Sequence, residues 1–309
     1  MQGGPRTVRA ADGARRGAPR TPVRGQRTPR RPARHGPRTG IAAGAISIGV
    51  SLLALLAVSL LMPARRREVA GIAAVFRERR LRPWEASGAV LGACFVASQG
   101  LTAPMIGVAL FSIAVTAGQA CGALFVDHIG LSPSGRQAVS RSRVIATALA
   151  VTTMGVGASE QLTAGVAWAT VLAAATPLAT GAGLSVQQAL NGRIARVVGP
   201  WAATVNNMVV GLATPIVAFA VSLLAAGSLN GMPGDADLYI GGLLGTAFVA
   251  LTSWLARIHG VLVLGLSVIA GQVLAAGAIQ HGHATPMSLI PVALTLTGVL
   301  IALRQRAHH

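Results

Sequence analysis

The chain has 309 residues, 52% of them apolar, and a formal net charge of +18 that comes from 26 arginines, no lysine and 8 acidic residues. A soluble domain carries roughly a quarter charged residues, whereas residues 86–303 hold only ten. This composition excludes a water-soluble enzyme and a nucleic-acid-binding domain, and it predicts an all-α, polytopic membrane protein.

A basic segment, residues 1–40, opens the chain with 11 arginines, six prolines and one acid. It has no apolar period and cannot bury enough surface to offset the entropy lost on ordering, so we expect it to be disordered. Arginines near a membrane gain about 1 kcal/mol each from anionic lipids. Anionic lipid headgroups are therefore candidate partners of this tail.

Nine apolar stretches follow the tail. A hydrocarbon core about 30 Å thick requires roughly 20 apolar residues per helix. The ten charged residues between 86 and 303 all fall between the stretches, as the cost of a charge inside a bilayer predicts. The predicted spans are 41–62, 86–103, 106–126, 144–159, 165–188, 201–226, 238–254, 260–280 and 285–303.

The arginines divide the connections between these spans into two sets. Seven follow the first span, three the third, two the fifth, one the seventh and two the ninth, whereas the other connections have none. The positive-inside rule places the arginine-bearing set in the cytoplasm. We therefore expect a multi-pass plasma (inner) membrane protein with a cytoplasmic C-terminus. The same rule places the basic tail outside, which conflicts with its charge.

An internal repeat has a spacing of 153 residues. The segment GAVLGACFVAS (88–98) matches GGLLGTAFVAL (241–251), and the register continues without a gap. Further along, Gly118-Gln119 pairs with Gly271-Gln272, His128 with His281, and Pro133 with Pro286. A duplication accounts for such a register better than chance similarity between apolar helices.

The two copies are expected to be inverted, because corresponding spans lie five helices apart and an odd number reverses orientation. The first copy occupies residues 41–160 with four spans, and the second occupies 165–303 with five. Five plus five is the arrangement that we expect, so the first copy lacks its first helix. Restoring that helix would put both ends of the chain in the cytoplasm and remove the charge conflict.

Several short motifs occur in a characteristic order. They are Pro83-Trp84 before Gly88 and Gly92; Gly118-Gln119; Asp127-His128 and Gly130; Gln188, Asn191 and Gly192; Gly199-Pro200; and Asn207 and Gly211. With two inverted halves, this pattern resembles the drug/metabolite transporter superfamily, in particular its YdcZ-type branch of inner-membrane exporters. The likeness covers residues 41–303, and the first helix of that family has no counterpart here.

The resemblance implies a substrate site near the bilayer midplane, between the halves. Uncharged amides are candidates for its lining because they offer donors and an acceptor without the cost of a charge. The alternative is that they are hydrogen-bonding contacts between packed helices. The candidate substrate-path residues are Gln119, Gln272, Gln187, Gln188, Asn191, Asn206 and Asn207.

Two further groups of residues complete the candidate site. Pro177, Gly181 and Pro215 are candidates for helix breaks that expose backbone carbonyls, and the alternative is a tolerated kink. Asp127 and His128 are candidates for proton coupling, because a carboxylate beside an imidazole can respond to pH. The alternative for that pair is a cap and anchor at the membrane interface.

The sequence favours a secondary transporter that exports a small molecule. None of the predicted spans shows the paired acids, His-Glu motif or Ser–His arrangement of an intramembrane enzyme, and we expect neither a metal site nor a cofactor. Because no predicted span holds a buried carboxylate, a neutral or zwitterionic solute is favoured over a lipophilic cation. The alternatives are a structural or lipid-binding membrane protein and a truncated, inactive transporter, and a homodimer is left open.

Overall fold

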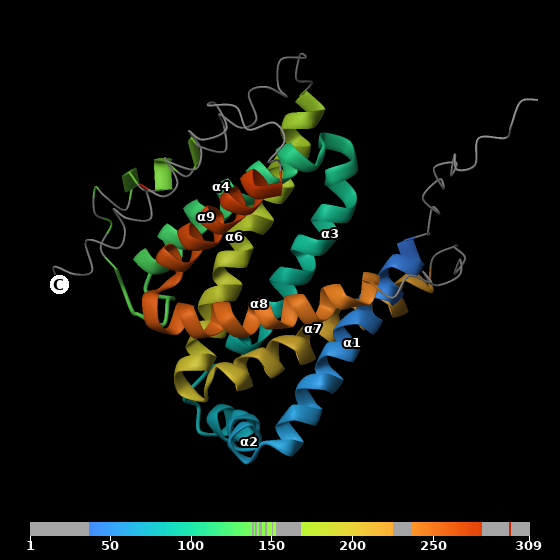
Figure 1. Ribbon diagram of the computed structural model, residues 1–309, viewed down its shortest axis with the longest axis vertical. Helices are drawn as coiled ribbons and strands as arrows, with labels where there is room; N and C mark the ends of the chain where they lie inside the picture. The colour runs from blue at the N-terminus through green and yellow to red at the C-terminus, as the bar shows by residue number, and fades with distance from the viewer. Residues whose placement is uncertain are drawn as a thin grey trace, which may run out of the picture. The chain divides into compact units, whose positions relative to one another are not determined.

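The architecture is that of a helical bundle, described here from a computed structural model (Figure 1). The structure describes residues 37–137, 139, 141, 144–145, 147–149, 151–152, 168–224, 237–279 and 297. Within these residues the regular elements are helices, without a strand. They are α1 (Pro37–Leu61), α2 (Pro63–Arg77), η1 (Pro83–Ser87), α3 (Gly88–Ile106), α4 (Val108–His128), α6 (Trp168–Val197), α7 (Pro200–Ser222), α8 (Asp237–His259) and α9 (Val261–Ile279).

Five stretches of helix in the described part are long and apolar enough to cross a membrane: Ile41–Leu61, Pro83–Ile106, Leu110–His128, Pro200–Ser222 and Gly241–His259. They confirm the predicted all-α, polytopic membrane bundle. The predicted span at 285–303 and most of the one at 144–159 fall outside the described residues, as do residues 1–36 of the basic tail.

The structure differs from the sequence prediction at both ends of the first span. The tail was expected to be disordered through residue 40, but α1 begins at Pro37, where a proline fits the first turn of a helix. The arginine-rich connection at 63–85 is not a loop, because it contains α2 and η1. The apolar side of α2 buries Val75 against Ile194 and Ala203. Tertiary packing therefore stabilises a helix in a segment whose many arginines suggested a loop.

The centre of the bundle is α6, which contacts α3, α4, α7, α8 and α9. Figure 1 shows α4, α6 and α9 running side by side, and a shared apolar core fills the contact between them. Glycines allow α4 and α6 to approach closely: a Cβ on Gly118 would lie 1.9 Å from the carbonyl oxygen of Leu178, and one on Gly181 would lie 2.1 Å from that of Val115. Small residues at such crossings are typical of helices packed in lipid.

One end of the bundle collects most of the described arginines. The indole nitrogen of Trp201, in the first turn of α7, donates to Ser59 Oγ near the end of α1. The side chain of Arg196, near the end of α6, donates to the carbonyl oxygen of Pro133, after α4. We call this region the arginine-rich end, and it comprises residues 62–87, 127–137, 193–200 and 256–260.

Candidate functional site

Three buried amides form a hydrogen-bonded cluster between α6 and α7. Gln187 Nε2 and Asn191 Nδ2 both donate to Asn207 Oδ1, each across 2.9 Å. The three side chains are 9%, 4% and 5% exposed, so the cluster lies inside the bundle. Gln187 and Asn191 share a helix face because they are four residues apart. We call these three residues the amide cluster.

The amide cluster lies within the membrane-spanning part of α7. Asn207 comes seven residues after Pro200, which corresponds to about 10 Å of helix, and it is about 6 Å short of the helix midpoint at Gly211. The cluster therefore lies between the arginine-rich end and the centre of the helix. Uncharged amides at this depth meet part of their hydrogen-bonding capacity with one another.

The glycines of α3 make room for the amide cluster. A Cβ on Gly92 would lie 2.7 Å from Gln187 Oε1, and one on Gly88 would lie 3.3 Å from the Cβ of Leu190. The Gly-x-x-x-Gly motif therefore packs α3 onto α6 at the level of Gln187. As a result, the cluster adjoins a helix of the predicted first copy, although its own residues come from the second.

The structure distributes the other four candidate amides around the bundle. Gln188 is buried next to the cluster in sequence, and its Oε1 has no hydrogen-bond partner among the described residues. Asn206 is half-buried and donates to the carbonyl oxygen of Ala86 across 3.0 Å. Gln119 is buried on α4, whereas its repeat counterpart Gln272 is exposed on α9. The two predicted symmetry mates thus have different surroundings.

The prolines do not interrupt their helices. α6 continues through Pro177 and α7 continues through Pro215. Each proline removes one backbone donor, so the predicted helix breaks amount to a missing hydrogen bond rather than an unwound segment. Gly181 serves close helix packing, because the absence of a side chain lets α6 lie against the backbone of α4 at Val115.

Asp127 links the end of α4 to the start of α9. Its carboxylate, 2% exposed, accepts hydrogen bonds from the backbone N–H groups of Val261 (3.3 Å) and Leu262 (3.1 Å). These donors have no partner within their own helix, and a negative charge at a helix N-terminus is favourable. His128 Nδ1 is buried without a hydrogen-bond partner among the described residues. This geometry is that of a cap, and proton coupling by the pair stays a prediction.

Replacing Asp127 with alanine should destabilise the protein by about 1–2 kcal/mol, because the first turn of α9 loses the acceptor of two N–H groups. Asp127→Asn, which keeps one side-chain oxygen, should cost less. Thermal unfolding in one detergent measures both. Equal unfolding temperatures for the wild type and Asp127→Ala would contradict the assignment as a cap.

Glu85 corrects the expectation that no span holds a buried carboxylate. It lies within the apolar stretch Pro83–Ile106, and it is 2% exposed. Its Oε1 lies 2.6 Å from Nε of Arg193, at the end of α6, and its Oε2 accepts from the backbone N–H of Arg82. The paired guanidinium offsets the cost of burying the charge. This pair could not be predicted from the sequence, because its two residues are 108 positions apart.

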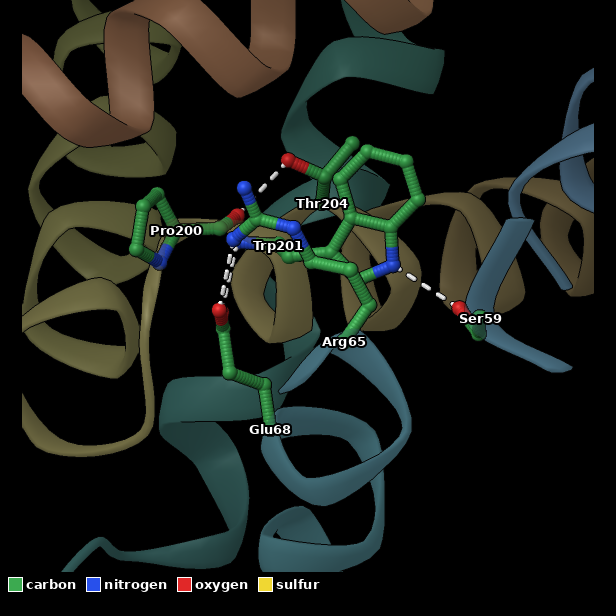
Figure 2. A network of polar contacts seen from close by, with 6 residues as sticks. All are labelled: Ser59, Arg65, Glu68, Pro200, Trp201 and Thr204. Atoms are coloured by element: carbon green, nitrogen blue, oxygen red, sulfur yellow. Dashed lines mark hydrogen bonds and ion pairs between the residues drawn. The ribbon is translucent and has the colours of Figure 1, made fainter. Parts of the chain in front are cut away.

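Figure 2 shows a second polar network that sequence reasoning missed, at the start of α7. Glu68 Oε2 accepts from the backbone N–H of Trp201 (3.2 Å), and its Oε1 pairs with Arg65 at 2.7 Å. The guanidinium of Arg65 lies over the Trp201 ring, 5.4 Å from its centroid. A Cβ on Gly199 would overlap Glu68, which explains a glycine before Pro200. A carboxylate of α2 thus caps α7.

The described site is chemically simple. The amide cluster carries no charge, and the charged side chains described above lie nearer the arginine-rich end. Among the described residues, no group of three or more His, Cys, Asp or Glu side chains could hold a metal ion. The arrangement offers hydrogen-bond donors and acceptors to an uncharged or zwitterionic group.

Comparison with known proteins identifies a family that the chain matches. The model of a family described as "Putative inner membrane exporter, YdcZ", of the drug/metabolite transporter group, matches residues 34–156 and 172–303. The two matched regions correspond closely to the two predicted copies. A search of curated proteins gives no match.

Proposed function

Since the chain belongs to the YdcZ family of inner membrane exporters, we propose that it is a secondary transporter that exports a small molecule by alternating access between two inverted halves. Half one comprises residues 41–160, and half two comprises residues 165–303. The observation that carries the proposal is the amide cluster, which is uncharged, buried and next to a helix of the other half. Its Asn207 lies in the apolar stretch Pro200–Ser222.

The pattern of helix contacts supports the inverted relation of the halves. The repeat pairs α1 with α7, α3 with α8 and α4 with α9. A twofold relation then requires that α3 contact α7 wherever α8 contacts α1, and both contacts are present. The repeat pairs α1–α7 and α4–α9 are also in contact, as expected for pairs that lie next to such an axis. In transporters built from inverted repeats, each half can adopt the conformation of the other, and this exchange opens the substrate site to one side of the membrane and then to the other.

Equivalent glycines of the two halves have different surroundings among the described residues. In half one, Cβ atoms on Gly88, Gly92 and Gly118 would meet α6. Cβ atoms on their repeat counterparts in half two, Gly241, Gly245 and Gly271, would have no neighbour within 4 Å in the part of the chain that the structure describes. The counterpart of α6 would lie against these three glycines. Gln272 on α9 is likewise exposed, although a polar amide deep in a span needs a protein partner.

Polar contacts join the two halves at the arginine-rich end. Each long-range polar contact described there joins the halves: Glu68 with Trp201, Glu85 with Arg193, and Asp127 with Val261 and Leu262. The positive-inside rule assigns this end to the cytoplasm. We infer that loading from the cytoplasm requires these contacts to separate.

The substrate class follows from the polar groups available. The amide cluster presents no fixed charge, and both buried carboxylates are already engaged, one by Arg193 and one by the start of α9. A lipophilic cation would find no free counter-charge among the described residues of the spans. A neutral or zwitterionic solute with hydrogen-bonding groups fits better.

Solute efflux from proteoliposomes tests the proposal. A mixture of small neutral and zwitterionic metabolites is loaded, and the rate of loss of each is compared with protein-free vesicles. Asn207→Leu should reduce efflux of the transported solute at least tenfold, because it removes the acceptor that organises Gln187 and Asn191. Ser267→Ala is the control, since Ser267 is exposed and bonds only to its own helix.

Two results would reject parts of the proposal. If no solute leaves faster than from protein-free vesicles, although the protein is folded and inserted, the chain is not a transporter of these classes. If efflux occurs and Asn207→Leu leaves it unchanged, transport stands but the amide cluster is not on the path. Asn207→Asp, which keeps an acceptor for both amides, separates loss of the site from loss of the fold.

A further inference from the structure

The exposed face of α2 carries positive charge that the transport mechanism does not use. Arg66 and Arg77 lie on the same helix face, since eleven residues correspond to three full turns, and Arg67 lies beside them. All three are exposed, whereas the opposite face buries Val75 and packs Phe76 against the bundle. The helix is therefore fixed by its apolar side and presents arginines outward.

The segment after α2 extends this charge. Arg79, Arg80 and Arg82 are exposed as well, which makes six exposed arginines between residues 66 and 82. Within the same interval the exposed acid is Glu78, because Glu68 is turned inward to Arg65 and Trp201. Like charges kept close together destabilise a protein unless they meet an anionic partner. We call these six arginines the α2 patch.

The position of the α2 patch relative to the membrane follows from α1. The apolar stretch Ile41–Leu61 ends two residues before α2 begins. Its last residues, Leu60 and Leu61, are 75% and 81% exposed, as expected for side chains that face lipid. Trp84, 46% exposed, follows the patch, and tryptophan favours the boundary between hydrocarbon and headgroups. The patch thus lies where phosphate groups begin.

We propose that the α2 patch binds the headgroups of anionic phospholipids in the adjacent leaflet. A guanidinium can donate two parallel hydrogen bonds to one phosphate, which a compact ammonium cannot do. Zwitterionic phosphatidylcholine also has a phosphate, but its choline cancels the net charge that the patch attracts. This site is separate from the basic tail, and it lies on the helix whose Glu68 caps α7.

Native mass spectrometry of the full chain tests this site with phosphatidylglycerol as the probe and phosphatidylcholine as the reference lipid. The test variant is Arg66→Gln/Arg67→Gln/Arg77→Gln. The wild type should retain phosphatidylglycerol at least tenfold more strongly than phosphatidylcholine. Each arginine near a bilayer surface corresponds to about fivefold in affinity, so the triple variant should lose most of this preference.

Matched variants make the result decisive. Arg15→Gln/Arg16→Gln/Arg20→Gln removes the same charge from the tail and should keep the preference for phosphatidylglycerol. Arg66→Lys/Arg67→Lys/Arg77→Lys keeps the charge, and it should bind more weakly than the wild type and more strongly than the glutamine variant. The thermal unfolding of each variant in detergent without added lipid controls for folding.

Three outcomes would overturn the proposal. They are equal retention of both lipids by the wild type, undiminished preference in the folded glutamine variant, and an equal loss when the tail arginines are replaced. If the glutamine variant does not fold, the lysine variant decides, because undiminished binding by it would contradict bidentate recognition. Displacement of the lipid by inorganic phosphate at an equal concentration would indicate a free-phosphate site instead.

Discussion

Gly118→Ala should prevent the protein from folding or destabilise it by about 3 kcal/mol or more, whereas Gly271→Ala should leave its stability almost unchanged. The two glycines occupy equivalent positions in the repeat, in α4 and α9. A Cβ on Gly118 would lie 1.9 Å from the carbonyl oxygen of Leu178, while one on Gly271 would have no neighbour within 4 Å among the described residues. The obstacle at Gly118 is backbone, so no rotamer change can relieve it.

The measurement is thermal unfolding of both variants and the wild type in one detergent, together with the yield of monodisperse protein. Alanine is favoured over glycine in a helix by roughly 1 kcal/mol, so Gly271→Ala can show a small gain. A comparable loss for both variants would contradict the difference in surroundings between the two glycines. A tolerated Gly118→Ala would contradict the close contact between α4 and α6.

Breaking the pair between Glu85 and Arg193 should have the second-largest effect. Removing one partner of a buried ion pair costs about 3–5 kcal/mol, and the lower end applies because the Arg193 side chain is 36% exposed. Of the two single changes, Arg193→Leu should destabilise the protein more, because it leaves the carboxylate of Glu85, which is 2% exposed, without its counter-ion. Glu85→Leu leaves an arginine that can still reach water.

A double-mutant cycle separates the pair from its surroundings. Glu85→Leu/Arg193→Leu should be less destabilised than the sum of the single variants, since replacing both charges leaves no buried charge unpaired. Unfolding midpoints of the four proteins give the coupling. Additive effects would show that the two side chains do not stabilise each other, although their Nε and Oε1 atoms lie 2.6 Å apart.

The helices that cross the membrane could be predicted from the sequence because a long apolar run has few alternatives in lipid. The predicted span at 260–280 corresponds to α9 (Val261–Ile279), and the one at 86–103 corresponds to α3 (Gly88–Ile106). The helix α2 was missed because seven arginines near it suggested a cytoplasmic loop. The helical spacing of Val69, Ile72, Val75 and Phe76 is the signal that could have revealed it.

The candidate site was only partly predictable. Gln187, Asn191 and Asn207 stood out as polar residues in apolar helices, and the structure brings these three together. It does not bring Gln119 and Gln272 into equivalent places, because Gln119 is buried and Gln272 is exposed.

The capping contacts could not be predicted at all. Asp127 meets residues 134 and 135 positions away, and Glu68 meets Trp201 across 133. The residues around a carboxylate do not indicate which helix N-terminus it will cap, since that depends on the packing of the whole bundle. Positions 127 and 68 resemble ordinary charged residues at span ends until the fold brings the partner helices to them.

The central claim is that the two halves separate at the arginine-rich end. The most direct test is to measure the distance between two spin labels, one on each half, at this end. Labels at Ala74→Cys on α2 and Ile258→Cys on α8, with Cys94 and Cys121 replaced by serine, report this separation in lipid nanodiscs. We expect a single distance in the otherwise unchanged protein and an added, longer population when Glu68→Gln and Glu85→Gln weaken the contacts between the halves. An identical single distance in both proteins, with solute efflux intact, would contradict alternating access at this end.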